Sequence, residues 1–426
     1  MKKGILSIGG LGLPVSRDLY YAGTERIISY LDDEFVKKGH YSIVAAPGDS
    51  EVSGELFATI PQSLWRAKNG SGERDILRGD EIYAEHYDKV INYVISNQNR
   101  IDIVHDHSGN GLVNSDGFWN RRDKWPSHIP ILTTHHANTG IGFDENKYKR
   151  WRKLKKEGHL VFFNGISYSQ KEEFERNTGI GLDEVIYHGV PLQLFPFNEN
   201  PHDYLFSLGR ICGEKGQDYA IQVARKTGRP LILGGEVHSV DEDYFSEKVK
   251  LHLDFSIRNL DKNEAKKFKS NFLERLASGE DVMKDGRVKF IGGLTDKEKA
   301  LIYGNAFAYL MPITWSEPFG LVMIESMATG TPVVGFDYGS VPEVIDHGRS
   351  GYIIPKISLN GDLEITGRKN LNEEAMIEEM VKAVENVGKI SRTETRKRVE
   401  NNFTSELEAI NYLSLYGILT NNGLSR

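Results

Sequence analysis

Cysteine and long apolar runs are what this sequence most clearly lacks. Cys212 is the only cysteine among 426 residues, which excludes a disulfide within the chain and a cysteine-rich metal site. No stretch approaches the roughly 20 apolar residues that a membrane-spanning helix needs. Glycines interrupt the apolar residues near the N-terminus (1–14), so this segment is too short for the core of a signal peptide. We therefore expect a soluble, cytoplasmic protein.

An excess of positive charge is also absent. The chain has 53 lysine and arginine residues against 60 aspartate and glutamate residues, a formal net charge of −7. Nucleic-acid-binding domains present basic surfaces to the phosphate backbone, so the composition argues against a nucleic-acid partner. With 39% hydrophobic residues over this length, the chain can build two domains with proper cores.

Several catalytic motifs are missing as well. The sequence has no P-loop, no HExxH pair on a helix and no pattern typical of a Ser-His-Asp hydrolase. Its early glycines, at positions 9, 10 and 12, do not have the GxGxxG spacing of a dinucleotide-binding motif. Hydrolase, ATPase and dinucleotide-dependent functions therefore lack support.

What is present is a regular alternation of strands and helices. An amphipathic helix (25–38) separates apolar strands at 4–8 and 41–46, and the same order begins again at residue 204. A strand–helix–strand unit implies a parallel sheet. The chain is thus predicted to have an α/β fold with two Rossmann-like, doubly wound domains.

The predicted domains cover residues 1–195 and 196–402. A stretch rich in proline, asparagine and phenylalanine (195–203) is the expected linker. An amphipathic helix is expected at 403–418. Residues 241–284 are expected to form a charged, helical surface addition without chemistry of its own.

Residues 311–355 carry the densest group of functional residues. An apolar strand ends at Pro312, and a loop then brings Glu317 to the carboxyl end of that strand, where open α/β sheets bind ligands. A helix is predicted over 321–329, so Glu317 precedes its N-terminus and Glu325 lies about one turn inside it.

This arrangement suits a polar, partly anionic ligand. The amides of Phe319, Gly320 and Leu321 belong to the start of the predicted helix, where free N–H groups favour phosphate or hydroxyl oxygens. The two glutamates can accept hydrogen bonds from sugar and ribose hydroxyls. The competing interpretation makes Glu317 a partner of the helix dipole and Glu325 a solvated helix residue. The residues alone favour neither.

A family resemblance favours the ligand-binding interpretation of Glu317 and Glu325 over the competing one. The run from Glu317 to Glu325 (EPFGLVMIE) resembles the EX7E signature of family 4 glycosyltransferases, which are retaining enzymes with the GT-B fold. Residues 327–334 (MATGTPVV) and 339–343 (GSVPE) are also similar to that family.

The resemblance implies both a fold and an activity. GT-B proteins have two Rossmann-like domains facing a central cleft, and their last helix, here 403–418, returns to the first domain. The implied activity is transfer of a sugar, with retention of configuration, from a nucleotide-diphosphate sugar to an acceptor hydroxyl. The implied mechanism is front-face and needs no metal or other cofactor. The acceptor can be a glycan, a lipid or a small molecule, so contact with the inner face of the membrane stays open.

Site roles also follow from the resemblance. Glu317 would orient the donor sugar and steady positive charge at its anomeric carbon. Glu325 would hold the ribose, and Leu294 would contact the edge of the base through its backbone. Gly23, in a glycine turn similar to the family's N-terminal one, would lie opposite the donor phosphates. The alternative for that turn is an ordinary helix start with Thr24 as its cap.

Transfer from a nucleotide diphosphate requires positive charge beside the departing diphosphate, and two cationic residues are candidates to supply it. Arg210 and Lys215 lie in the loop after the first strand of the second domain, each beside a glycine. Fixed cations can do the work of a metal ion at such a place. The pair resembles the family's phosphate-binding residues, and the competing interpretation is a solvated charged turn.

Four histidines follow apolar strands of the first domain: His105, His107, His135 and His136. Imidazoles delivered to one edge of a sheet can form a metal site or line a sugar site. The resemblance matches His135, in a Thr-x-His pattern, to a histidine near the donor sugar's C6 hydroxyl. It leaves the other three as candidates on the acceptor side. His188 falls where the family often has asparagine, and we expect a structural role for it.

Two other classes of function compete with transfer. A nucleotide-sugar epimerase of the same fold would need carboxylates in the first domain as proton-transfer bases, and none can be assigned. A non-catalytic sugar-nucleotide binding module would be expected to have lost Glu317, Lys215 or His135, and all three are present. Acceptor specificity is expected in loops of the first domain, especially 47–78 and 138–151, where the sequence offers no code.

Overall fold

The chain folds into two compact units. The computed structural model describes residues 2–17, 19, 22–64, 67–68, 71–72, 79–109, 111–137, 145–285, 287–359 and 371–424. The first unit comprises Met1–Arg17, Ala22–Gly189 and Ser405–Arg426, and the second comprises Asp18–Tyr21 and Val190–Thr404. The main boundary therefore lies at Gly189 rather than at residue 195, and the last helix belongs to the first unit.

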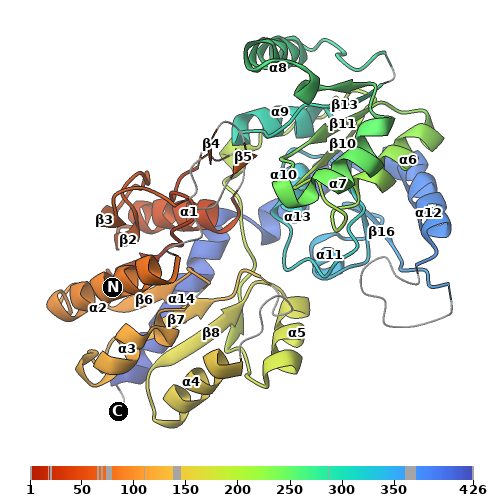
Figure 1. Cartoon of the computed structure of the whole chain (residues 1–426). Coiled ribbons are helices and arrows are strands. Elements are labelled where there is room, and N and C mark those ends of the chain that lie inside the picture. Colours follow the sequence, from red (N-terminus) through yellow and green to blue (C-terminus); the bar gives the residue numbers. More distant parts are fainter. Residues whose placement is uncertain are drawn as a thin grey trace. The chain divides into compact units, whose positions relative to one another are not determined.

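The first unit is built on a seven-stranded sheet in which all the paired strands are parallel, in the order β3-β2-β1-β6-β7-β8-β9 (Figure 1). Its strands are β1 (Gly4–Ile8), β2 (Tyr41–Pro47), β3 (Glu55–Ile60), β6 (Ile103–Asp106), β7 (Ile131–Thr134), β8 (Val161–Gly165) and β9 (Glu184–Val185). A separate antiparallel pair is formed by β4 (Ala67–Lys68) and β5 (Ser71–Gly72).

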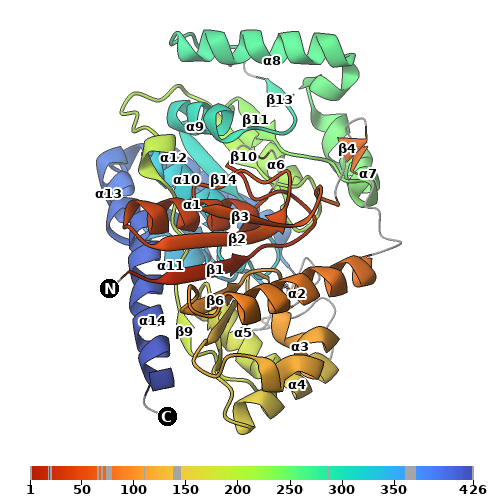
Figure 2. The same ribbon diagram turned by 90° about the vertical axis from the view of Figure 1, so that its left-hand side faces the viewer.

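Helices pack around this sheet. They are α1 (Thr24–Lys37), α2 (Gly79–Ser96), α3 (Asp116–Arg121), α4 (Glu145–Lys156), α5 (Tyr168–Thr178) and α14 (Ser405–Leu424). The C-terminal helix α14 packs against α1, near the start of the chain, and Figure 2 shows the two helices meeting. Residues at opposite ends of the sequence therefore share one core.

The second unit repeats the architecture with another parallel sheet, in the order β12-β13-β11-β10-β14-β15-β16. Its strands are β10 (Leu205–Leu208), β11 (Leu231–Gly234), β12 (Phe255–Ser256), β13 (Val288–Phe290), β14 (Ala308–Met311), β15 (Val333–Phe336) and β16 (Gly351–Ile354). Its helices are α6 (Gln217–Thr227), α7 (Glu242–Tyr244), α8 (Lys262–Ala277), α9 (Asp296–Asn305), α10 (Leu321–Ala328), α11 (Val341–Val344), α12 (Glu373–Asn386) and α13 (Arg392–Asn402).

The sequence explains why the central strands form where they do. Strands covered on both faces by helices read as continuous apolar runs, and every residue of β1, β14 and β15 is buried. Pro312 follows β14 directly and cannot donate to the sheet, so the strand ends there. The predicted α/β class with two doubly wound parallel sheets is confirmed.

Three segments differ from expectation. The segment 47–78, expected as a loop, contains β3, which pairs with β2 at the edge of the first sheet. The segment 138–151 contains the start of α4, where Tyr148 and Trp151 are largely buried in the core. Within 241–284, the short strand β12 extends the second sheet, so that segment is more than a surface addition.

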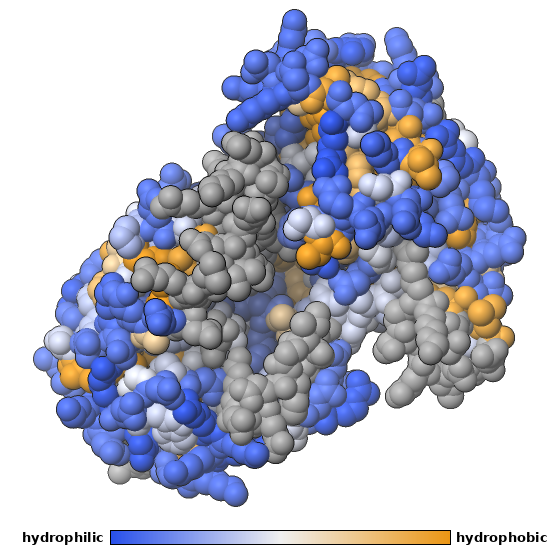
Figure 3. All heavy atoms as spheres, viewed as in Figure 1, coloured by the Kyte–Doolittle hydropathy of each residue, from blue (hydrophilic) through white to orange (hydrophobic). Residues whose placement is uncertain are grey.

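The visible surface is mainly hydrophilic, with apolar residues in scattered groups (Figure 3). Over the described part of the chain, no helix combines the length and the apolar character needed to cross a bilayer.

Arg392, at the start of α13, fastens several backbone segments of the second unit. Its Nε donates to the carbonyl of Asn198 at 2.6 Å, and its two terminal nitrogens donate to the carbonyls of Ala306 and Gly304 at 3.0 and 2.8 Å. It also donates to Thr331 Oγ1 at 2.7 Å. Burial lowers the pKa of Arg392 to about 10, which leaves the guanidinium charged at neutral pH.

Replacing this guanidinium should destabilise the second unit. Arg392→Met removes a donor from four acceptors, and we expect the free energy of unfolding to fall by about 3 kcal/mol, measured by denaturant unfolding. The control is Lys397→Met on the same helix, an exposed lysine paired with Glu394, which should change stability by less than about 0.5 kcal/mol. Equal stability of the two variants would contradict this role for Arg392.

Candidate active site

Two loops of the second unit meet at the carboxyl edge of its sheet. β10 and β14 are neighbouring parallel strands, so the loops that follow them emerge side by side. The first loop carries Lys215 and the second carries Glu317. Lys215 Nζ lies 2.6 Å from Glu317 Oε2. The structure thus brings together a cation and a carboxylate that are far apart in the sequence.

Trp315 completes this pair. Its indole Nε1 donates to Glu317 Oε2 at 3.0 Å, and Lys215 Nζ lies 4.8 Å from the centroid of its ring. The Lys215 side chain is 24% exposed and the Glu317 side chain 11%, so a ligand can reach both. Sequence reasoning missed Trp315, although an aromatic residue two positions before the glutamate of a ligand loop was visible.

Two glycines allow the loops to approach each other. Gly339 has φ +57°, and a Cβ there would lie 2.3 Å from the backbone N and O of Glu317. Gly216 has φ +68°, and a Cβ there would lie 2.1 Å from the carbonyl oxygen of Pro312. The amide of Ser340 donates to the Glu317 carbonyl at 2.9 Å. Glu317 is therefore fixed through its backbone as well as its side chain.

The start of α10 lies directly beyond Glu317. Gly320 is its N-cap residue with φ +78°, and α10 begins at Leu321. The first amides of a helix have no partner within the helix and point beyond its N-terminus. The ring of Phe319 is buried 6.0 Å from that of Phe403, and Ser340 Oγ donates to the Phe319 carbonyl at 2.8 Å. This packing fixes the direction in which the amides point.

Arg210 does not join the pair. Its Nη2 lies 3.1 Å from Glu214 Oε2, in the same loop, and its Nε lies 3.5 Å from Asp241 Oδ2. The side chain is 31% exposed. Arg210 and Lys215 thus share a loop as expected, but each is balanced by its own carboxylates.

Glu325 is fully buried, which overturns the interpretation of this residue as a solvated helix residue. Its Oε1 lies 2.6 Å from Lys299 Nζ, and Lys299 is also 2.7 Å from Asp296 Oδ1. Sequence reasoning missed Lys299. A buried lysine between two carboxylates leaves each charge with a partner, so removal of one member is costly.

Two donor-side candidates remain, Leu294 in the second unit and Gly23 in the first. The side chain of Leu294 is buried, so only its backbone can meet a ligand. A Cβ on the preceding Gly293 would lie 2.0 Å from Glu236 Oε1. In the first unit, Gly23 is the N-cap residue of α1, with φ −104° and nothing within 4 Å of an added Cβ. The fold itself therefore does not require glycine at position 23.

The candidate histidines His135 and His136 lie in different surroundings in the first unit. His107 Nδ1 lies 3.0 Å from His136 Nε2, and His136 Nδ1 lies 3.2 Å from His188 Nε2. His135 lies elsewhere, with its ring centroid 4.4 Å from that of Phe174 and 5.3 Å from that of Trp151. Successive side chains of an extended segment point to opposite faces, which explains why His135 and His136 separate.

His188 contacts Glu408, a partner that the sequence did not indicate. His188 Nδ1 lies 2.8 Å from Oε1 of Glu408 on α14, and the amide of Gly189 donates to Glu408 Oε2 at 2.8 Å. We call His107, His136, His188 and Glu408 the histidine chain. Burial raises the pKa of Glu408 well above its ordinary value and lowers that of His188 to about 3.

His105 packs beside this chain, with its ring centroid 3.7 Å from that of His107. Its Nδ1 lies 2.6 Å from the hydroxyl of Tyr416, and its Nε2 lies 2.6 Å from Thr134 Oγ1. Among the residues that the structure describes, no group of three or more histidine, cysteine, aspartate or glutamate side chains is arranged to hold a metal ion.

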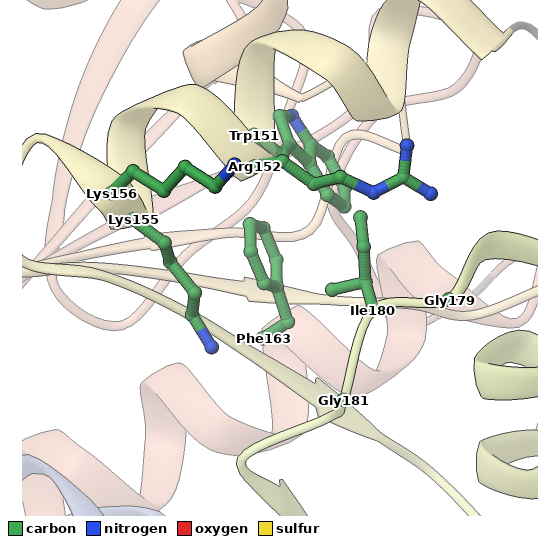
Figure 4. Close-up of a pocket in the computed structure, with 8 residues that line it drawn as sticks. All are labelled: Trp151, Arg152, Lys155, Lys156, Phe163, Gly179, Ile180 and Gly181. Atoms are coloured by element: carbon green, nitrogen blue, oxygen red, sulfur yellow. The ribbon is translucent and has the colours of Figure 1, made fainter.

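A surface cavity of about 220 Å³ lies between α4 and the loop after α5 (Figure 4). Phe163 and Ile180 form part of its wall, and Arg152, Lys155 and Lys156 surround it. None of the residues described above as candidates lines it. Lys155 is already paired with Asp183, at 3.0 Å.

Comparison with known proteins relates the second unit to a family of transferases. Residues 195–364, which lie within the second unit, match the model of the family Glycosyl transferases group 1. The phosphatidyl-myo-inositol mannosyltransferase of Mycobacterium leprae is 37% identical over 68 residues, which cover 16% of this chain and 18% of the relative. Spore coat protein SA of Bacillus subtilis is 31% identical over 147 residues, or 34% of this chain and 36% of the relative. The matched segments thus cover about a fifth of the first relative's length and about a third of the second's.

The fold resemblance extends over nearly the whole chain. A sucrose-phosphate synthase from Thermosynechococcus elongatus superposes with a TM-score of 0.66 at 18% identity, covering 98% of this chain and 99% of the other. The Anabaena protein HepE in complex with UDP gives a TM-score of 0.61 at 16% identity, covering 98% and 100%. The two parallel sheets and their helices therefore form the GT-B fold.

The buried charges around Glu325 allow a direct test of their role. Lys299→Met removes the cation that pairs with two buried carboxylates, and we expect the second unit to lose about 3–5 kcal/mol of stability, measured by denaturant unfolding. The control is Lys297→Met, two positions away on the exposed face of α9, which should be nearly neutral. If Lys299→Met left the free energy of unfolding unchanged, the stability of the second unit would not depend on the pairing of these carboxylates with Lys299.

Proposed function

We propose that this chain is a retaining glycosyltransferase, which moves a sugar from a nucleotide-diphosphate sugar to an acceptor hydroxyl by a front-face mechanism. The observation that carries the proposal is the contact of Lys215 with Glu317, beside Trp315 and the start of α10. It lies at the carboxyl ends of two neighbouring strands, where α/β sheets bind ligands. It also lies within the part of the chain that matches the glycosyl transferases group 1 model.

The chemistry requires a cation that can change partner. Lys215 is balanced by Glu317 in the absence of donor, and the β-phosphate of a donor offers it a stronger negative charge. Glu317 then remains beside the anomeric carbon, where it orients the sugar through its hydroxyls and stabilises developing positive charge. The acceptor's proton passes to the departing phosphate oxygen. Lys215 and Arg210 neutralise that diphosphate, so no metal or other cofactor is needed.

Other residues hold the rest of the donor. The amides of Phe319, Gly320 and Leu321 face oxygens of the donor sugar and phosphates, as helix N-termini do. Glu325 meets the ribose after Lys299 gives up part of its contact. The backbone of Leu294 meets the base.

The first unit supplies the remaining contacts. Gly23 leaves room for a phosphate. His135 contacts the donor sugar, and His105, His107 and His136 shape the acceptor side. UDP in the structure of HepE supports a nucleotide donor. The acceptor is a glycan, a lipid or a small molecule, and the protein acts in the cytoplasm, where a lipid acceptor would bring it to the inner face of the membrane.

A thermal-shift screen tests this function. Nucleoside diphosphates and nucleotide sugars with uracil, guanine or adenine bases are added without metal. A ligand at about a hundredfold its dissociation constant should stabilise the native state by about 2.7 kcal/mol. We expect one base to raise the melting temperature, and Lys215→Ala to abolish that rise.

The matched control is Lys226→Ala. Lys226 lies in the same unit and is also paired with a carboxylate, that of Glu378, but on the surface of α6 and α12. Its replacement should leave the nucleotide-dependent rise unchanged. No rise with any nucleotide, with or without divalent metal, in a folded protein would overturn the proposed function.

A further inference from the structure

The histidine chain of the first unit has a property that sugar transfer as proposed above does not use. Burial pulls the pKa of His107 and His136 well below the ordinary value, and that of His188 to about 3. All three rings are therefore neutral at physiological pH. A neutral imidazole carries one proton, so one ring nitrogen donates and the other accepts.

Because each neutral ring has one donor and one acceptor nitrogen, the tautomers of His107, His136 and His188 are coupled. Each ring in the chain uses one nitrogen toward each neighbour, so the tautomer of one ring dictates that of the next. The ring planes of His136 and His188 differ by 11° and those of His107 and His136 by 33°, and both angles are compatible with N–H···N contacts between the rings. The chain therefore has two consistent arrangements, and Glu408 selects between them.

Ionised Glu408 accepts at both oxygens, from His188 Nδ1–H and from the amide of Gly189. All three rings then carry their proton on Nδ1, and His107 Nε2 presents a lone pair. When Glu408 is protonated on Oε1 it donates to His188 Nδ1. All three hydrogen bonds then reverse, and His107 Nε2 carries a proton.

The free end of the chain is His107 Nε2. His107 directly follows the last residue of β6, at the carboxyl edge of the sheet. The residue is 2% exposed, and within the described part of the structure its buried Nε2 has no hydrogen-bond partner. A buried polar atom without a partner costs free energy, and its presence calls for a reason. A hydroxyl group can satisfy this nitrogen in either state, because it both donates and accepts.

We propose that the histidine chain is a proton relay, in which a proton taken up at His107 Nε2 is stored on Glu408. The new N–H bond forms at His107 Nε2 while His107 passes its Nδ1 proton to His136 Nε2. His136 passes its Nδ1 proton to His188 Nε2, and His188 passes its own to Glu408 Oε1. One proton enters, one carboxylate is neutralised, and no ring ends as an imidazolium.

The proton comes from the acceptor hydroxyl, and in this respect the inference rests on the proposed function. The relay is the faster of two routes for that proton, and direct transfer to the departing phosphate oxygen is the route that remains when the relay is locked. Glu408 is then a positioning residue, because it reaches the substrate only through the rings.

The groups around the relay leave Glu408 as its site of charge. The titratable groups that face it are His105 of β6, Tyr412 and Tyr416 of α14, and Glu34 of α1, the last through Ser405. Burial lowers the pKa of His105 and raises those of both tyrosines, so these three are neutral. The carboxylate of Glu34 is balanced by Lys37, whose Nζ lies 2.7 Å from Glu34 Oε1. Asp106 accepts from the Ser108 and Leu112 amides on its own loop.

The first test uses Glu408→Gln and needs no substrate. The Gly189 amide can only donate, so the glutamine oxygen must face it and the glutamine NH₂ must face His188 Nδ1. This locks the relay in the reversed arrangement. Two-bond ¹H–¹⁵N spectra of the imidazoles, recorded from pH 6 to 9, report each tautomer. We expect the three wild-type rings to change tautomer together over one pH interval, and the variant to show Nε2–H rings throughout.

Two results of this test would overturn the relay. One is that the wild-type rings change independently or become imidazolium, and the other is that the variant keeps Nδ1–H rings. The control is Glu406→Gln on the same helix, an exposed residue paired with Lys38, and its spectra should match the wild type.

The second test follows hydrolysis of whichever nucleotide sugar raises the melting temperature, with water as the acceptor. Above the pH of the tautomer change, Glu408→Gln should be slower by about a hundredfold and should lose the pH inflection at that point. Its nucleotide-induced thermal shift should remain. An unchanged rate and profile would refute the catalytic use of the relay. If no nucleotide binds at all, the proposed function fails and the spectra alone decide the relay.

Discussion

The candidate site depends on one interaction, the ion pair between Lys215 and Glu317. The two residues belong to loops after neighbouring strands, and their contact fixes both loops at once. Trp315 adds a hydrogen bond and an aromatic face, and Gly339 permits the close backbone approach on the other side. A pair that is partly exposed costs less to separate than a fully buried one. The partial exposure of this pair supports the proposal that Lys215 exchanges its partner for a phosphate when the donor binds.

The two units treat buried polar groups in different ways. In the second unit, Glu325 and Asp296 are balanced by the positive charge of Lys299. In the first unit, no cation lies among the residues of the histidine chain, and burial favours neutral rings. Ion pairs hold a fixed geometry, whereas neutral rings can exchange protons at little cost in charge separation. The first arrangement suits binding of a charged donor and the second suits movement of a proton.

Much of the fold could be predicted from the sequence because the parallel strands are continuous apolar runs. The strands at 4–8 and 308–311 and the helix from Leu321 were visible in this way. β3 and β12 were not, because edge strands carry mixed residues, as the partly exposed pattern of Glu55–Ile60 shows. Short elements of this kind are defined by their neighbours in the sheet.

The candidate site could be predicted only in part. Glu317 and Lys215 were identified from their positions after strands and from a family resemblance, but their contact spans 102 residues of sequence. Lys299 and Glu408 were missed because helical lysines and glutamates are common and only tertiary packing buries these two. The separation of His135 from His136 follows from side-chain alternation, but which of the two faces the other histidines depends on the packing of α4 and α14.

The most direct measurement is the affinity of a nucleoside diphosphate for four proteins, by calorimetry: wild type, Lys215→Ala, Glu317→Gln and the double variant. If Lys215 leaves Glu317 to bind the β-phosphate, Lys215→Ala should weaken binding by about tenfold or more. Glu317→Gln should leave binding equal or tighter, since it releases the lysine, and the double variant should resemble Lys215→Ala alone. Binding that Glu317→Gln weakens as much as Lys215→Ala, with the two effects adding in the double variant, would contradict the exchange of partners at this site.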